Sequence, residues 1–157
     1  MAGFPLIEVW PYQPSDLSAV IELFQHSIRE TASADYNQAQ IDAWVQVDRD
    51  EWELARASRP TWVALVDGDI AGFADLEKNG LIDMMFVHPK YQRQSVGTSL
   101  LARIEAEADE CGITCLHTYS SITAKPFFEY CGFTMLLARA VVVRDERFIQ
   151  YVMEKVL

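Results

Sequence analysis

The sequence predicts a mixed α/β domain (α/β class with α+β character) around one central sheet of about seven strands, flanked by about four helices. The 157 residues suit one compact domain, which we expect to span residues 1–157. Half of the residues are hydrophobic, which is sufficient for a sizeable core. Segments with helical spacing of apolar residues alternate with short strand-like runs, in the order β-α-α-β-β-β-α-β-α-β-β.

Local patterns justify each element. The spacing of Asn37 and Gln40 predicts a capping box, and Ser15 is expected to cap the helix before it. The sequences DGD at 67–69 and NG at 79–80 predict tight turns that join three successive antiparallel strands. In chain order we expect a strand at 5–10, helices at 14–30 and 37–48 with helical character continuing over 50–58, strands at 61–66, 70–77 and 81–87, a helix at 95–111, a strand at 113–120, a short helix at 123–133 and a final hairpin of 135–143 with 147–156.

Composition excludes several classes of function. The net charge of −10 argues against nucleic acid as a partner, and no apolar run is long enough for a membrane span. The three cysteines form no CxxC pair, so neither a metal site nor a disulfide framework is expected. The N-terminus lacks the features of a signal peptide. We therefore expect a cytoplasmic protein.

A polar loop separates the strand at 81–87 from the helix at 95–111. The first N–H groups of a helix have no partner within the helix, and the helix dipole adds positive charge there. Glutamines, Arg93, Ser95 and Gly97 precede or open this helix. A phosphate site and an ordinary solvated loop both fit these residues. The patterns of a P-loop and of a dinucleotide fold are absent from the sequence.

A resemblance decides between these interpretations. The stretch MMFVHPKYQRQSVGTSLL is similar to the acetyl-CoA signature of the GCN5-related N-acetyltransferases (GNAT family), and SSITAKPFFEYCGF resembles the second landmark of that family. TASADYNQAQIDAW and SITAKPFFEYCGF further resemble its YafP-like bacterial branch. The resemblance implies a GNAT-like, mostly antiparallel, twisted mixed sheet. It also implies acetyl-CoA as cosubstrate, bound in a cleft between the strands at 81–87 and 113–120.

The resemblance carries the cofactor site onto particular residues. The strand backbone would pair with the acetyl and pantetheine groups, and the loop would hold the diphosphate. Ser95 replaces a glycine of the family, Ser121 stands where an asparagine is frequent, and Phe128 replaces the usual general-acid tyrosine. The expected cofactor-binding residues are Met85, Phe86, Val87, Gln92, Arg93, Gln94, Ser95, Val96, Gly97, Thr98, Ser121, Lys125 and Phe128.

The chemistry requires a group that takes a proton from the acceptor amine, whose free pKa is near ~10.4. Asp83 is favoured as the base or amine-orienting group, with Glu77 second; a structural cap is the alternative for Asp83. Water, Tyr130 or Tyr119 could protonate the thiolate. The expected acceptor-binding residues are His26, Glu30, Tyr36 and Trp44, for which a surface hydrogen bond and core packing are the alternatives.

Three functions remain open on the sequence. The first is an N-acetyltransferase that moves the acetyl group of acetyl-CoA to a primary amine of a small molecule or peptide, by direct attack in a ternary complex. The second is a non-catalytic acyl-CoA sensor of the same fold, and the third is a scaffold that binds protein. No metal is expected, and the closing hairpin could mediate a homodimer.

Overall fold

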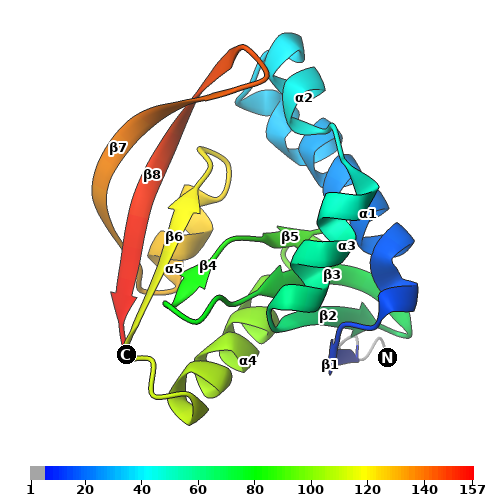
Figure 1. Ribbon diagram of the computed structural model, residues 1–157, viewed down its shortest axis with the longest axis vertical. Coiled ribbons are helices and arrows are strands. Elements are labelled where there is room, and N and C mark those ends of the chain that lie inside the picture. Colours follow the sequence, from blue (N-terminus) through cyan, green and yellow to red (C-terminus); the bar gives the residue numbers. More distant parts are fainter. Residues whose placement is uncertain (1–5) are drawn as a thin grey trace.

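The computed structural model describes residues 6–157 (Figure 1). The predicted α/β class is confirmed, although the sheet consists of two four-stranded halves. The first predicted strand begins at Ile7, and its expected start at Pro5 lies outside the described residues. The elements are β1 (Ile7–Pro11), α1 (Leu17–His26), α2 (Gln38–Trp44), α3 (Arg49–Ser58), β2 (Thr61–Val66), β3 (Asp69–Asp75), β4 (Leu81–Ile82), β5 (Met85–Val87), α4 (Val96–Glu110), β6 (Cys115–Ser120), α5 (Lys125–Tyr130), β7 (Thr134–Val143) and β8 (Glu146–Val156).

The two half-sheets have the strand orders β1-β2-β3-β5 and β4-β6-β8-β7. Every neighbouring pair is antiparallel except β4 and β6, which are parallel. The expectation of one strand over 81–87 is wrong, because the chain divides at Asp83 and Met84 into two short strands that join different half-sheets. Only β5 therefore continues the antiparallel succession of β2 and β3.

Helices cover both faces of the first half-sheet. In Figure 1, α1 and α3 lie on one face of β2 and β3, and α4 lies on the other. Helix α4 approaches β3 closely at Gly72, where an added Cβ would lie 2.8 Å from Cγ1 of Val96 and 3.1 Å from Cδ1 of Leu100. The central residues of β2 and β3 are consequently buried.

The second half-sheet is more open. Strand β7 forms one edge of this half-sheet, and most of the side chains of β7 are exposed to solvent. The predicted hairpin of β7 and β8 is confirmed, whereas its role as a dimer surface stays a prediction. Within residues 6–157, no helix combines the length and the apolar character that crossing a bilayer requires.

Of the two helix caps predicted from the sequence, the structure confirms one, and it also confirms the tight turn at 67–68. The capping box is confirmed, since the Asn37 side chain accepts a bond from N–H of Gln40 at 2.8 Å and the Gln40 side chain accepts one from N–H of Asn37 at 2.9 Å. The predicted turn at Asp67 and Gly68 is confirmed by φ angles of 50° and 90°. The prediction of Ser15 as a cap is wrong, because a 3-10 turn leads into α1 at this point.

Candidate functional site

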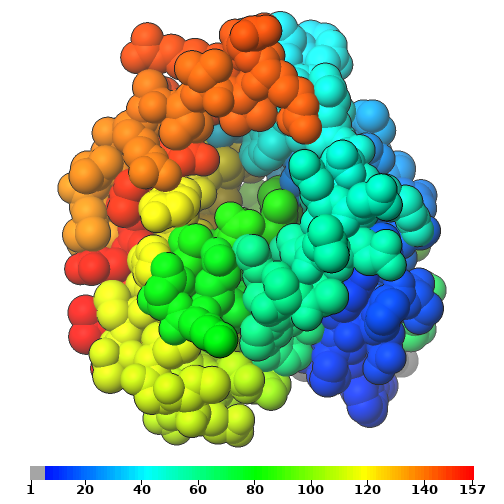
Figure 2. All heavy atoms as spheres, in the orientation of Figure 1, coloured from blue at the N-terminus to red at the C-terminus, as the bar shows by residue number. Residues whose placement is uncertain are grey.

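The gap between β5 and the end of β6 is the central feature of the site. Ile82 is the last residue of β4 to pair with β6, opposite Thr118, and the Thr118 hydroxyl donates to the Ile82 carbonyl at 2.8 Å. Beyond this point β5 pairs with β3, while β6 continues beside β8. Figure 2 shows a hollow bordered by the β4–β5 segment (green), β6 (yellow), the β7–β8 turn (orange) and the α2–α3 region (cyan).

One edge of β5 faces this gap. The Met84 carbonyl accepts a bond from Asp75 at 3.0 Å and the His88 amide donates to Ala71 at 2.7 Å, so both groups point toward β3. Because main-chain groups alternate along a strand, those of Met85 and Val87 point away from β3. The Val87 carbonyl accepts a bond from Nε2 of Gln92 at 2.9 Å. Within the described residues, the remaining N–H and C=O groups of this edge are available to a ligand.

The first turn of α4 offers further amides. Ser95 precedes it in the left-handed conformation, with φ 67°, and its side chain does not cap the helix. The hydroxyls of Thr98 and Ser99 donate to the Ser95 carbonyl at 3.0 and 2.7 Å. Because the Ser95 side chain does not cap the helix, the first-turn N–H groups of Val96, Gly97 and Thr98 make no bond within residues 6–157. Arg93 is exposed beside them, so the turn is suited to an anion.

Gly97 has a packing role that the sequence analysis missed. A Cβ at Gly97 would lie 2.8 Å from Cε1 of Phe127, which belongs to α5. The side chain of Val96 is buried against the sheet. The start of α4 is thus packed between the sheet and α5, and its first-turn N–H groups lie at the N-terminal end of the helix.

The residues around α5 make mostly structural contacts. Oγ of Ser121 accepts a bond from N–H of Ala124 at 3.1 Å. Nζ of Lys125 lies 3.0 Å from the Glu129 carboxylate. Phe128 is 4% exposed and packs in the core, and its hydrocarbon ring has no group that could donate a proton.

The two tyrosines considered as acids lie elsewhere. Tyr130 is 84% exposed and lines a shallow groove with Thr98 and Lys155, bounded by α4, α5 and β8. Tyr119 is 39% exposed, and its ring lies 4.2 Å from the Arg139 guanidinium. The roles of both remain predictions.

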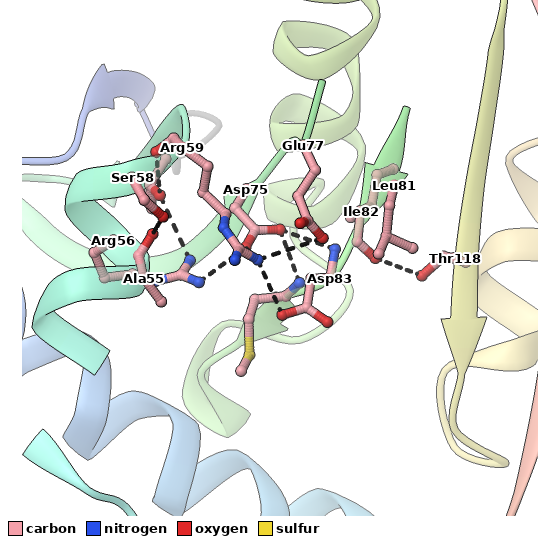
Figure 3. A network of polar contacts seen from close by, with 12 residues as sticks. Ala55, Arg56, Ser58, Arg59, Asp75, Glu77, Leu81, Ile82, Asp83 and Thr118 are labelled. Atoms are coloured by element: carbon pink, nitrogen blue, oxygen red, sulfur yellow. Dashed lines mark hydrogen bonds and ion pairs between the residues drawn. The ribbon is translucent and has the colours of Figure 1, made fainter. Parts of the chain in front are cut away.

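Asp83 and Glu77 belong to a charge network with Asp75, Arg59 and Arg56 (Figure 3). Nη1 of Arg59 lies 3.3 Å from the carboxylate of Asp83, 3.4 Å from that of Glu77 and 3.7 Å from that of Asp75. Asp83 is half-exposed, with 42% of its side chain accessible. The two proposed bases thus share one arginine at the break between β4 and β5.

The buried part of the network is Asp75 and Arg56. Nη2 of Arg56 lies 2.9 Å from Oδ2 of Asp75, and the two residues are 3% and 0% exposed. Oδ1 of Asp75 accepts bonds from the amides of Asp83 and Met84, both at 2.9 Å. Burial raises the pKa of the Asp75 carboxyl above its usual value, although the Arg56 guanidinium opposes this effect.

Arg56, Arg59 and Asp75 belong to this network although none of them was expected at the site from the sequence. One signal was available, because Arg56 follows Trp52 by four positions and therefore shares its helix face. A charge on a face that also carries a large aromatic residue indicates a buried partner. The guanidinium of Arg56 does lie 5.9 Å from the Trp52 ring.

The four acceptor candidates form two groups. Nδ1 of His26 lies 3.7 Å from the Glu30 carboxylate, and its ring stacks on His88 at the end of β5. The rings of Tyr36 and Trp44 lie 5.2 Å apart. This second group packs against Phe86 of β5 and Phe148 of β8.

Tyr36 links the N-terminal helices to the end of β6. Its hydroxyl accepts a bond from the Ile122 amide at 2.9 Å. Burial raises the pKa of the Tyr36 phenol, so it stays protonated at neutral pH. No group of three His, Cys, Asp or Glu residues in the described part of the chain could hold a metal ion.

Comparisons with known proteins agree with this geometry. A family model described as an acetyltransferase (GNAT) domain matches residues 32–155. An uncharacterised N-acetyltransferase of Escherichia coli, YafP, is 34% identical over 147 residues, which are 94% of each chain. This similarity supports the YafP-like branch that two sequence motifs indicated.

Solved structures show the same fold. A GCN5-related N-acetyltransferase of Rhodopseudomonas palustris has a TM-score of 0.92 at 29% identity, with 100% of this chain and 98% of that chain covered. YncA of Salmonella typhimurium, solved with its cofactor acetyl-CoA, has a TM-score of 0.70 at 21% identity over 96% and 93% of the two chains. The family match and the identity to YafP show that the chain belongs to the GNAT family of acetyltransferases.

Proposed function

We propose that the protein transfers the acetyl group of acetyl-CoA to a primary amine of a small molecule or peptide, by direct attack in a ternary complex. The observation that carries the proposal is that β5 leaves one edge unpaired beside the gap and leads into the unbonded first turn of α4. Amides in these two places can bind an acetyl donor that has peptide-like groups at one end and a diphosphate at the other. Membership of the GNAT family and the acetyl-CoA bound to YncA support the choice of donor.

Acetyl-CoA would bind along β5. The free groups of Met85 and Val87 would hold the pantetheine arm and orient the thioester. The amides at the start of α4 and the exposed Arg93 would hold the diphosphate. Gln92 and Gln94 act indirectly, because their side-chain amides donate to the carbonyls of Val87 and Lys90 and so shape the loop.

The acceptor amine would approach from the opposite side of the gap. Tyr36 and Trp44 offer an aromatic wall next to Phe86. Asp83 would receive the ammonium group and then accept its proton directly or through water, with Glu77 as the second candidate. The carboxylate of Asp83 is accessible, and Arg59 holds it in place.

The departing thiolate does not require an acidic side chain beside it. A thiol with a pKa near ~8.5 is a good leaving group, so water can protonate it without a tyrosine at position 128. The second candidate function, an acyl-CoA sensor without turnover, rests on Phe128, whose side chain has no hydroxyl to protonate the thiolate. The two functions differ in whether an amine accelerates the release of coenzyme A.

The test measures thiol release from acetyl-CoA with a panel of amines. We expect at least one amine to accelerate release and Asp83→Asn to lower kcat by about 10²-fold or more, with an altered pH profile. Glu77→Gln is the parallel variant, since Glu77 is the second candidate base and contacts the same arginine; a larger loss of kcat there than in Asp83→Asn would assign the role of base to Glu77. Binding of coenzyme A without acceleration by any amine would favour the sensor, and a wild-type pH profile in Asp83→Asn would remove Asp83 from the role of base.

A further inference from the structure

We propose that Asp75 and Arg56 are a positioning pair that keeps β4 and β5 divided and thereby holds open the gap beside β5. Asp75 supplies the acceptor that turns the chain, and Arg56 supplies the charge that keeps this acceptor in place. The consequence for acetyl-CoA binding rests on the proposed function, whereas the geometry of the break does not.

Two successive amides at the break between β4 and β5 point in the same direction. In a regular strand, neighbouring N–H groups point to opposite sides. The amides of Asp83 and Met84 instead donate to one atom, Oδ1 of Asp75, both at 2.9 Å. An extended strand cannot satisfy this arrangement, so the chain has to turn at these two residues.

Asp75 also ends the regular ladder. Its amide donates to the Met84 carbonyl at 3.0 Å, as the next antiparallel pair would require. The return bond from Met84 goes to the Asp75 side chain rather than to its main-chain carbonyl. A side chain thus replaces the main chain at the last position of the pairing between β3 and β5.

Arg56 makes this arrangement possible. An ionised carboxylate that is 0% exposed is costly unless it is paired, and Nη2 of Arg56 lies 2.9 Å from Oδ2. Because Arg56 occupies Oδ2, Oδ1 stays free for the two amides. Arg59 is farther away, at 3.7 Å, and more exposed, so it is the weaker partner.

The break decides which strands neighbour the gap. With the chain turned at Asp83 and Met84, β4 pairs with β6 and β5 pairs with β3. A continuous strand would keep one set of neighbours along its whole length, and the free edge of β5 would not diverge from β6. Asp75 and Arg56 would therefore affect the affinity for coenzyme A through the main chain of Met85.

Two double variants separate the acceptor from the charge. Both carry Arg56→Met, so neither buries an unpaired guanidinium. Asp75→Asn keeps a carbonyl oxygen for the two amides, whereas Asp75→Leu keeps similar volume and removes the acceptor. The measurements are hydrogen exchange of the Asp83 and Met84 amides and the Kd of coenzyme A by calorimetry, with unfolding curves as a check on folding.

We expect the asparagine variant to keep both amides protected and to bind coenzyme A nearly as the wild type does. The leucine variant should lose this protection, keep protection in β2 and β3, and bind coenzyme A about 10-fold more weakly or worse. Equal affinity in the two folded variants would overturn the proposal. If the leucine variant does not fold, the wild type and the asparagine variant decide. Rapid exchange of the two amides in the wild type would then overturn the proposal. Slow exchange in the wild type, together with retained affinity in the asparagine variant, would support it. Neither measurement requires turnover, so wild-type protein that binds coenzyme A but acetylates no amine would contradict only the proposed function.

Discussion

The two ends of β5 differ in whether the polar groups there already have partners. At its start, the buried pair of Asp75 and Arg56 holds the chain through a side-chain carboxylate. At its end, an exposed loop and the first turn of α4 offer main-chain amides that nothing in residues 6–157 occupies. Loss of the buried pair at the first end should therefore cost the most stability, whereas loss of the exposed Arg93 side chain at the second end should lower cofactor affinity with little effect on stability.

The largest effect is expected at the start of β5. Arg56→Ala should lower the free energy of unfolding by about 3–5 kcal/mol, because the Asp75 carboxylate stays buried without its main counter-ion. Urea denaturation measures this loss. Arg59→Ala is the matched control and should cost only about 0–1 kcal/mol, since Arg59 is partly exposed. Similar losses in the two variants would break the distinction between the buried and the exposed part of the network.

Gly97→Ala tests whether the start of α4 is also a packing site. The new Cβ would lie 2.8 Å from the Phe127 ring, so we expect a loss of about 1–3 kcal/mol, reduced by the better helix propensity of alanine. Thermal unfolding measures it. Adding Phe127→Leu should recover part of the loss by making room. A gain in stability from Gly97→Ala alone would show that the ring moves freely.

Arg93→Ala tests the end of β5 as a cofactor site. The KM for acetyl-CoA should rise roughly 3- to 10-fold, because one charge-assisted contact to the diphosphate is lost, while the unfolding curve stays unchanged. Lys90→Ala removes the same charge from the same loop and should change KM less. If both variants have the wild-type KM, Arg93 does not contact the cofactor.

The smallest effect is expected at Ser95, whose φ of 67° is left-handed. Ser95→Gly should relieve strain of about 1 kcal/mol, partly offset by the greater entropy of glycine in the unfolded chain, for a net gain of about 0.5 kcal/mol. Gln94→Gly is the control and should destabilise, because Gln94 does not have a positive φ. Denaturant midpoints compare the two, and a loss in Ser95→Gly would contradict the assignment of strain.

The sequence predicted features that depend on a few neighbouring residues. The capping box of Asn37 and Gln40 and the turn at Asp67 and Gly68 are confirmed, because each is satisfied within four positions of the chain. The succession of a strand, a proline, a polar loop and a helix is also local. Together with a second motif, it was sufficient to indicate the family.

Other features of the site depended on residues far apart in the chain. Tyr36 meets Ile122, and Arg56 meets Asp75, only after the helices have packed on the sheet. The apolar pattern of 81–87 predicts one strand, yet the Asp75 carboxylate divides it by taking two successive amides. The sequence by itself therefore determined the family, most elements and the loop before α4. Tertiary structure decided where the strand divides and which carboxylates lie together, because a buried charge is tolerated only where a distant partner is brought within hydrogen-bond distance.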